Sequence, residues 1–276
     1  MKNLKVLFED SAVLLDCDRR SLVVSDIHLG YELELAKKGI SLPQRASSIA
    51  NRLIDLGNKH EAKGLYILGD VKHKVAWASP ADWFQVTTFF NRLQAWFEDI
   101  VVTLGNHDGG IRSLIPASVT MVGTRGTTIQ CRNDTITLLH GNAWPGPESI
   151  RSSYVITGHG HYMIELKDSA GLRLLEPIWL IGVLDKQRYM QDRGDNLVSK
   201  GQDKDMILII LPAFNRIVGG ISVNRTETRH PSPMMKYLIE ERTQLYLTDG
   251  TFLTTLSKIR ELERDSRKEL ENASQH

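Results

Sequence analysis

The stretch IVVTLGNHDG, residues 100–109, runs from an apolar segment straight into an amide, an imidazole and a carboxylate. A short β-branched run followed by glycine is typical of a buried strand that ends in a tight turn. Asn106, His107 and Asp108 therefore follow the carboxyl end of a predicted strand. Because polar residues are common in turns, this stretch alone does not show whether they form a site.

The same pattern recurs along the chain: a short apolar run that ends in glycine, aspartate or histidine. Such runs, mostly four to six residues long and rich in leucine or β-branched residues, are typical of buried strands. They occupy residues 4–8, 12–15, 21–25, 64–69, 100–105, 135–141, 154–160, 171–177 and 206–214. The spacing predicts a fold with many buried strands.

Two stretches with helical spacing separate the early strands. Residues 44–62 repeat apolar side chains at helical intervals, and residues 80–98 do the same after a proline suited to a first turn. Alternation of strand and helix indicates a parallel layer. After residue 119 strands follow one another directly, which predicts a second, antiparallel sheet. We expect an α/β fold, a two-sheet β-sandwich flanked by helices with a parallel-rich first half.

The chain is long enough for one large domain, and we expect residues 1–276 to form it. Residues 185–205 are polar and interrupt two apolar runs, which predicts an exposed, mobile insertion. Residues 254–276 carry mixed charges with apolar residues on one side, which predicts a C-terminal helix.

Composition excludes several classes of protein. The 34 basic and 33 acidic residues give a net charge of +1, so no global field favours nucleic acid or an anionic membrane. Cys17 and Cys131 are too few for a disulfide scaffold, and we expect free thiols. The N-terminal MKNLKVLFED lacks the apolar segment of a signal peptide, and no run approaches the roughly 18 apolar residues of a membrane span. We expect a soluble cytoplasmic protein that makes no membrane contact.

Carboxylates and imidazoles follow five of the predicted strands. In an open α/β sheet, ligands bind at the carboxyl ends of the strands, so side chains placed there converge on one edge. The residues at these ends are Asp26 and His28, Asp70, Asn106 and His107, His140, and His159 and His161. Glycine accompanies nearly every one, which indicates tight turns and close backbone approach.

A single histidine or aspartate at a strand end is more often a satisfied polar residue or a helix cap. We interpret four other histidines in this ordinary way, namely His60, His73, His230 and His276. The ordered set at consecutive strand ends is harder to explain as independent turns. Imidazole and carboxylate donors without cysteine suit Mn, Fe, Zn or similar ions, and a set larger than one tetrahedral ion takes suits two ions that share a carboxylate. Such a pair can clamp both oxygens of a phosphoryl displacement.

The set of motifs D-x-H at 26–28, G-D at 69–70, G-N-H-D at 105–108, H-G at 140–141 and G-H-G-H at 158–161 resembles the calcineurin-like metallophosphoesterase superfamily. GDVKH at 69–73, LPAFNRIVGG at 211–220 and LYLTDGTFL at 245–253 are similar to phosphoesterases related to the SbcD nucleases, including the DNA-ligase-associated group. The resemblance implies a four-layer αββα arrangement.

Carried over by position, the resemblance implies a role for each motif residue. One metal would be held by Asp26, His28, Asp70 and His161, and the second by Asp70, Asn106, His140 and His159. His107 would stabilise the transition state and protonate the leaving oxygen, and Asp108 would orient His107. The ions would be two divalent cations, Mn first, with Fe, Zn, Ni or Co as alternatives. Two positions depart from the pattern of many relatives: His73 replaces an aspartate or asparagine, and Asn142 replaces a histidine.

The leading functional hypothesis is a two-metal phosphoesterase, a phosphodiesterase or nuclease that attacks nucleic-acid or nucleotide phosphodiesters through metal-bound hydroxide. The resemblance also implies a phosphodiester substrate, DNA or RNA among them, and a DNA-processing protein as partner. One alternative is a phosphomonoesterase or a cyclic-nucleotide phosphodiesterase. Another is a non-catalytic binding module on the same fold, which the complete ligand set and the presence of His107 disfavour.

Overall fold

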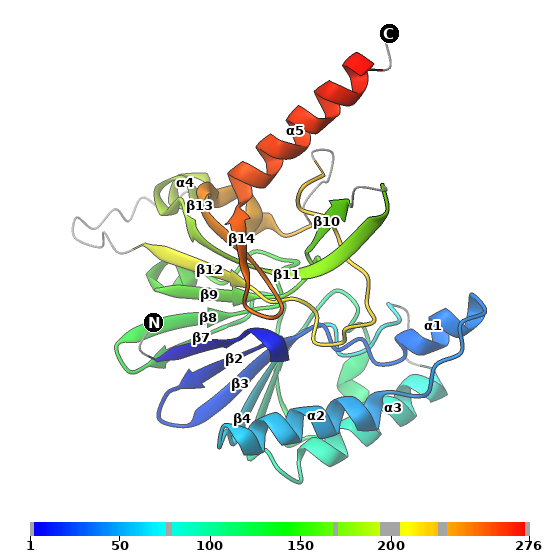
Figure 1. The fold of residues 1–276 in the computed structure, drawn as a ribbon. Helices are drawn as coiled ribbons and strands as arrows, with labels where there is room; N and C mark the ends of the chain where they lie inside the picture. Colours follow the sequence, from blue (N-terminus) through cyan, green and yellow to red (C-terminus); the bar gives the residue numbers. More distant parts are fainter. Residues whose placement is uncertain (1–2, 76–78, 168–170, 194–204, 226–230, 274–276) are drawn as a thin grey trace.

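Two β-sheets lie face to face at the centre of the molecule, as the computed structural model shows (Figure 1). The structure describes residues 3–75, 79–167, 171–193, 205–225 and 231–273. The first sheet has the strand order β1 (Leu4–Leu7), β2 (Ala12–Asp16), β3 (Arg20–Ser25), β4 (Gly64–Leu68), β5 (Asp99–Thr103) and β6 (Thr120–Val122). Strands β3 to β6 are parallel, as predicted, and β1 to β3 are antiparallel.

The second sheet mixes parallel and antiparallel pairs. Its order is β14 (Phe252–Thr255), β13 (Leu238–Leu247), β11 (Arg173–Leu184), β12 (Met206–Ile210), β9 (Tyr154–Thr157), β8 (Asp134–Leu138) and β7 (Thr127–Cys131), with β10 (Met163–Lys167) paired to the start of β11. The prediction of an antiparallel second sheet is wrong for β8, β9 and β12, which are parallel. The connection from β8 to β9 contains only the short 3-10 helix η3 (Pro147–Arg151). The sequence therefore shows no helical periodicity there that would predict a parallel crossover.

Helices cover the outer faces of the sheets. On the first sheet they are α2 (Ala46–Lys59) and α3 (Pro80–Leu93), with the short α1 (Tyr31–Lys37) beside them (Figure 1). The other elements are α4 (Lys186–Asp192), α5 (Leu256–Ala273), and the 3-10 helices η1 (Phe8–Asp10), η2 (Ile111–Ser113) and η4 (Pro233–Tyr237). Helix α3 begins with a capping box, because Ser79 and Asp82 each accept the other's backbone N–H.

Three apolar clusters separate these layers. The first joins α2 and α3 to the first sheet through side chains such as Leu53 and Phe90. The second lies between the sheets and includes Val23 of β3 and Ile156 of β9. The third covers the outer face of the second sheet and includes Tyr237. Three cores between four layers confirm the predicted α/β sandwich flanked by helices.

The described part of the insertion 185–205 differs from the exposed, mobile segment that we predicted. The insertion 185–205 begins with the helix α4, which Asp185 caps by accepting the N–H of Arg188 and which buries Tyr189. That part is therefore packed structure, because one tyrosine anchors it to the apolar cluster of the second sheet. Residues 194–204 lie outside the described part of the chain. The C-terminal helix is present and begins at Leu256.

Cys17 and Cys131, which we predicted to be free thiols, form a disulfide. Their Cα atoms lie 4.8 Å apart although 114 residues separate them in sequence. Cys17 directly follows β2 of the first sheet and Cys131 ends β7 of the second, so the stacking of the sheets brings them together. Spacing along the chain does not reveal such a pair. Within the described residues, none of the helices has the length and apolarity to cross a membrane.

Candidate metal centre

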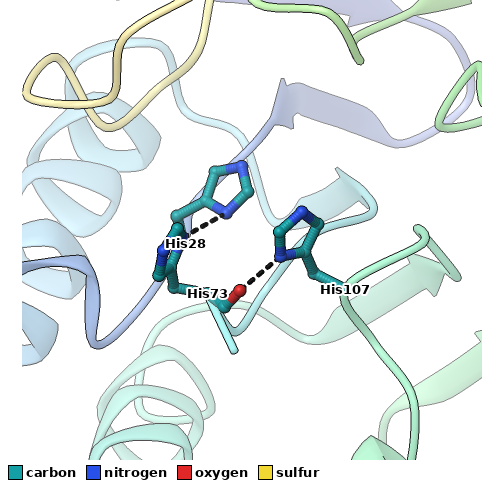
Figure 2. A group of neighbouring side chains, drawn as sticks. All are labelled: His28, His73 and His107. Atoms are coloured by element: carbon teal, nitrogen blue, oxygen red, sulfur yellow. Dashed lines mark hydrogen bonds between the residues drawn. The ribbon is translucent and has the colours of Figure 1, made fainter. Parts of the chain in front are cut away.

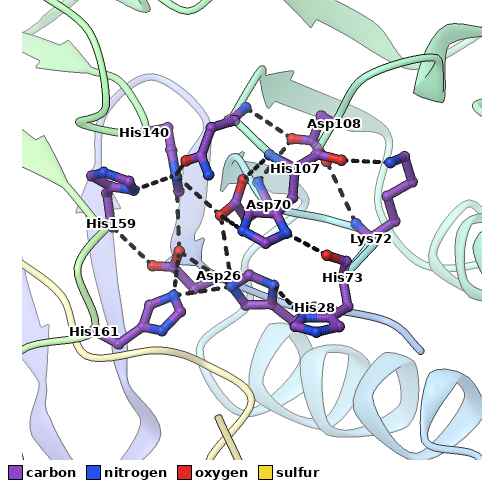
Figure 3. Close-up of polar contacts among 12 residues, drawn as sticks. Asp26, His28, Asp70, Lys72, His73, His107, Asp108, His140, His159 and His161 are labelled. Atoms are coloured by element: carbon purple, nitrogen blue, oxygen red, sulfur yellow. Dashed lines mark hydrogen bonds and ion pairs between the residues drawn. The ribbon is translucent and has the colours of Figure 1, made fainter. Parts of the chain in front are cut away.

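The seven residues predicted as metal ligands meet at one edge of the two sheets (Figure 3). They follow the ends of β3, β4 and β5 in the first sheet and of β8 and β9 in the second. These strands are parallel within each sheet, so their carboxyl ends point to the same edge. Two groups of side chains form there, and in each group the candidate ligand atoms lie within 4.8 Å of one another.

The first group consists of Asp26, His28, Asp70 and His161. Nε2 of His161 lies 3.0 Å from Nε2 of His28 and 3.1 Å from Oδ1 of Asp26. Nε2 of His28 lies 3.7 Å from Oδ2 of Asp70. The other ring nitrogen of His161 donates to the carbonyl of Gly219 at 2.9 Å, which leaves the Nε2 lone pair directed at the group.

The second group consists of Asp70, His140 and His159, with Asn106 at its edge. Nε2 of His140 lies 3.3 Å from Oδ2 of Asp70, 3.0 Å from Nδ1 of His159 and 3.3 Å from the amide oxygen of Asn106. Nδ1 of His140 donates to the carbonyl of Leu68 at 2.8 Å. Nε2 of His140 is therefore the nitrogen left for a metal.

Asp70 belongs to both groups. Its Oδ2 atom lies between Nε2 of His28 at 3.7 Å and Nε2 of His140 at 3.3 Å. Its Oδ1 atom accepts the backbone N–H of His107 at 2.9 Å, which fixes the carboxylate plane. The side chain of Asp70 is thus the one that spans the two sets of donors.

The backbone is held in an unusual conformation at these positions. Five of the predicted ligands have left-handed φ angles, namely Asp26 (58°), His28 (45°), Asp70 (50°), His159 (61°) and His161 (42°). Residues other than glycine rarely adopt this region, and such strain is concentrated at functional sites. The sharp turns aim alternate side chains from short segments at one point.

Glycines permit the close approach that these turns need. A Cβ on Gly105 would lie 2.1 Å from Oδ1 of Asp70, and one on Gly158 would lie 2.3 Å from Oδ2 of Asp26. Both distances are far below van der Waals contact. The two glycines therefore let neighbouring turns pack directly against the two carboxylates of the first group.

The charges of the two groups depend strongly on each other. Burial would raise the pKa of Asp26, but the nearby imidazoles, first that of His161, hold it well below its usual range. Burial would lower the pKa of His140, but the neighbouring aspartates raise it to about 9. Burial prevails at His28 and His159, whose pKa values fall to about 3 and about 4. In the absence of a cation, the raised pKa of His140 favours its protonated form.

His107 stands beside the shared carboxylate without belonging to either of those two groups. Its Nε2 atom lies 3.9 Å from Oδ2 of Asp70, and its side chain is 23% exposed. Its Nδ1 atom donates to the backbone carbonyl of His73. Because Nδ1 is hydrogen-bonded to this carbonyl, Nε2 is the ring nitrogen that faces the open side of the cluster. His107 can therefore donate or accept a proton at Nε2 toward a bound group.

Asp108 has a different role from the predicted one, because its hydrogen bonds go to the backbone and none of them is to the His107 ring. One oxygen accepts the N–H groups of Asp70 and Gly105, each at 2.8 Å, and the other accepts that of Val71 at 2.9 Å. The turn after β5 points the buried Asp108 carboxylate back under the turn after β4. Burial raises the pKa of Asp108. The residue ties together the two loops that carry Asp70 and His107.

Sequence reasoning missed three residues of this site. His73, interpreted as an ordinary polar residue, places Nδ1 3.3 Å from Nδ1 of His28 (Figure 2). Its Nε2 lies 2.6 Å from Oε2 of Glu34 of α1. The ammonium of the buried Lys72 donates to the carbonyl of His107 at 2.5 Å. The only hint of this in the sequence was that His73 replaces the aspartate or asparagine of many relatives. His60 lies outside the cluster, and His230 and His276 lie outside the described residues.

The donor set suits divalent cations. Imidazole nitrogens whose lone pairs converge, such as Nε2 of His28 and Nε2 of His161 at 3.0 Å, require a proton or a cation between them. Buried carboxylates complete each group, and no thiolate takes part. Nitrogen and oxygen donors in this mixture suit Mn, Fe, Zn and neighbouring metals. The residues present therefore fit divalent cations.

Comparison with known proteins points to one family. Residues 19–222 match the family model described as calcineurin-like phosphoesterase. The nuclease MPE of Pseudomonas putida is 22% identical, with a TM-score of 0.54 over 89% of this chain and 92% of that chain. The phosphoesterase Yfce of E. coli is 14% identical, with a TM-score of 0.39 over 85% of this chain and 97% of that one. At 22% identity, the likeness to the Pseudomonas putida protein is one of fold. No curated protein matches the sequence.

Proposed function

Because this chain belongs to the calcineurin-like phosphoesterase family, which makes it a metal-dependent hydrolase of phosphate esters, we propose that it is a two-metal phosphodiesterase acting on nucleic acids or nucleotides. The observation that carries the proposal is the position of Asp70. Its Oδ2 lies 3.7 Å from Nε2 of His28 in one donor group and 3.3 Å from Nε2 of His140 in the other. One carboxylate between two histidine groups suits a pair of cations and serves a single cation less well.

The proposed ligands divide between the two ions along the two groups. Asp26, His28, Asp70 and His161 would hold the first, and Asp70, Asn106, His140 and His159 the second. When bound, such ions activate water near neutral pH and neutralise charge on a phosphoryl group. We propose manganese as the first choice, because carboxylate oxygens accompany the imidazoles in both groups and the amide oxygen of Asn106 lies beside the second.

His107 is the proposed general acid. A phosphodiester has an alkoxide leaving group, which needs a proton as the bond to phosphorus breaks. Nε2 of His107 faces the cluster, while Nδ1 is held by the His73 carbonyl. The imidazolium can give its Nε2 proton to the leaving oxygen while it keeps the proton on Nδ1. Lys72 would hold the loop in place through the His107 carbonyl.

Asp26 and Asp108 keep this arrangement rigid. Oδ2 of Asp26 accepts the hydroxyl of Ser25 at 2.6 Å and the N–H of His159 at 3.1 Å, so only Oδ1 faces the donor group. Asp108 accepts the backbone N–H groups of Asp70 and Gly105 and so holds the two turns together. Each of the two proposed ligand sets takes residues from both sheets. We therefore propose that residues 1–276 act as one domain.

The proposed substrate class follows from the family and from one fold neighbour. The Pseudomonas putida protein of similar fold bears the name nuclease, and we extend that activity to this chain as part of the proposal. A protein of DNA processing is the proposed partner. The net charge of +1 provides no general attraction to nucleic acid, so the phosphate would be recognised at the metal cluster itself.

Activity measured against a panel of metals tests this function. Metal-free protein is supplied with Mn, Fe, Zn, Ni, Co or Mg ions and assayed on bis-p-nitrophenyl phosphate, p-nitrophenyl phosphate, a cyclic nucleotide and single-stranded DNA and RNA. We expect activity that needs added metal and favours the diester over the monoester. Higher turnover of the monoester would indicate a phosphomonoesterase. The absence of all hydrolysis with two ions bound would indicate a binding module.

A further inference from the structure

The two histidines of the first donor group differ in the hydrogen-bond partner of Nδ1, the ring nitrogen that points away from the group. Nδ1 of His161 donates to a backbone carbonyl, that of Gly219, at 2.9 Å, and His140 in the second group uses the Leu68 carbonyl in the same way at 2.8 Å. Among the described residues, no carbonyl accepts from Nδ1 of His28, which instead lies 3.3 Å from Nδ1 of His73 (Figure 2). A second imidazole thus occupies the place that a carbonyl takes elsewhere in the cluster.

The contact continues to a carboxylate on a different element. Nε2 of His73 lies 2.6 Å from Oε2 of Glu34, which is on α1. Tyr31, one turn earlier on α1, packs edge-on against the His73 ring with centroids 4.7 Å apart. Three side chains from three segments therefore form a line, carboxylate to imidazole to imidazole, that ends at the first donor group.

The backbone fixes the two histidines in register. The N–H of His28 donates to the carbonyl of Asp70 at 2.8 Å, and the N–H of His73 donates to the carbonyl of Leu29 at 2.9 Å. Residues 28–29 and 70–73 therefore run side by side. The neighbouring position of the two rings is a consequence of this pairing and does not depend on flexible side chains.

We propose that Glu34 and His73 are positioning residues that fix the orientation and tautomer of His28 for a cation in the first donor group. The direction of the hydrogen bonds follows from the carboxylate, which can only accept. Nε2 of His73 then carries its proton, Nδ1 of His73 accepts from Nδ1 of His28, and Nε2 of His28 is left with its lone pair toward Asp26 and His161. Partners of this kind raise the basicity of a ligand and fix its ring.

This inference rests on the proposed metal-dependent function, and its readout is metal affinity. Metal-free wild-type protein and variants are titrated with Mn²⁺ by isothermal titration calorimetry, with metal content measured separately. Glu34→Ala removes the carboxylate, and His73→Ala removes the connecting ring. Lys38→Ala is the matched control, because Lys38 is the other ionic partner of Glu34 and is the exposed C-cap residue of the same helix.

We expect one of the two ions to bind roughly 10- to 100-fold more weakly in His73→Ala and roughly 10-fold more weakly in Glu34→Ala, with the other ion unaffected. Lys38→Ala should bind both ions like the wild type. His73→Asn should regain most of the lost affinity, because an amide oxygen there can accept from Nδ1 of His28. In the His73→Asn background, Glu34→Ala should have no further effect.

Several results would overturn the inference. Wild-type affinity in both Glu34→Ala and His73→Ala would show that the pair does not act on His28. Three ions in the wild type and two in His73→Ala would make His73 a ligand, since His28, His73 and His107 also place donor atoms within 4.8 Å. Equal losses in Glu34→Ala and Lys38→Ala would indicate a general effect of α1. If the wild type bound no ions, the proposed function itself would fail, and this inference with it.

Discussion

The backbone N–H of Asp70 donates to the carboxylate of Asp108 across a distance of 2.8 Å. The two residues come from adjacent strand ends, after β4 and after β5, and the bond lies on the side of Asp70 away from the donor groups. The same Asp108 oxygen accepts the N–H of Gly105. A buried carboxylate thereby sets the position of the residue that both donor groups share.

Asp108→Asn should destabilise the fold and weaken metal binding. An asparagine has one oxygen, so its NH₂ group would face at least one backbone N–H and leave it without an acceptor. Leaving a buried donor unpaired costs about 1–3 kcal/mol. We expect the free energy of unfolding of the metal-free protein to fall by that amount in urea titrations. The matched control is Asp55→Asn, an exposed change on α2. Equal stability of the two variants would contradict the structural role.

Asp70→Asn should lower the occupancy of both ions. Its Oδ2 lies beside a histidine of each group, and a neutral amide is a weaker ligand than a carboxylate. His161→Ala should mainly release the first ion and His140→Ala mainly the second. Metal content after gel filtration checks all three. A single ion in fully metal-loaded wild-type protein, with His140 and His159 uncoordinated, would refute the two-ion arrangement.

Gly105→Ala should disturb the same carboxylate by contact alone. The added Cβ would lie 2.1 Å from Oδ1 and 2.5 Å from the backbone nitrogen of Asp70, so Asp70 has to move. We expect a loss of about 1–3 kcal/mol in unfolding free energy, as for other overpacked sites, and weaker binding of both ions. Gly123→Ala is the control, because no heavy atom lies within 4 Å of a Cβ there. If both variants bound metal equally well, the tight approach at Gly105 would be unimportant.

Metal binding should release a proton near neutral pH. In the metal-free protein, burial would lower the pKa of His140, but Asp70 and Asp26 raise it to about 9, so His140 is protonated at pH 7. A ligand imidazole must be neutral, and the second ion therefore displaces that proton. His159, with a pKa of about 4, contributes none.

The number of protons is measured by calorimetry in buffers with different ionisation enthalpies. We expect roughly one proton from the second site at pH 7, less release above pH 9, and an affinity that rises with pH between them. Any release from the first ion, where Asp26 raises the pKa of His161 against the effect of burial, is separated by repeating the titration with His161→Ala. Binding without proton release in both proteins would show that His140 is already neutral.

The strand ends could be predicted from sequence because parallel strands with polar ends converge by topology alone. Asp26 and Asp70 follow strands that were predicted to be parallel, so their convergence follows from the predicted sheet. His140 and His159 meet them because β8 and β9 are also parallel, which the predicted antiparallel second sheet did not include. Asp108 shows where adjacency in sequence misleads. It follows His107 directly, yet the turn sends its carboxylate in the opposite direction, toward the backbone of Asp70.

Contacts between segments that are distant in the sequence could not be predicted from periodicity and motifs. Glu34 meets His73 only because α1 packs beside the turn after β4, and α1 begins after Gly30 with no side-chain cap to announce it. Cys17 and Cys131 meet because two sheets stack. Such pairs depend on how layers are placed relative to one another, whereas periodicity reports only the face of one element.

His107→Asn or His107→Gln should separate proton transfer from metal binding. His107 is not one of the proposed ligands: its Nδ1 contacts the His73 carbonyl and its Nε2 lies near Asp70. Both ions should therefore remain bound, and stability should change little. The turnover number should fall by roughly 10²- to 10⁴-fold, the usual contribution of a positioned acid. The loss should be largest for a nucleoside 5′-hydroxyl leaving group and smaller for p-nitrophenolate, which can depart without a proton. Metal content and leaving-group dependence are measured on the same variant. An equal loss for both leaving groups would argue against an acid at this position, and loss of an ion would make His107 a ligand.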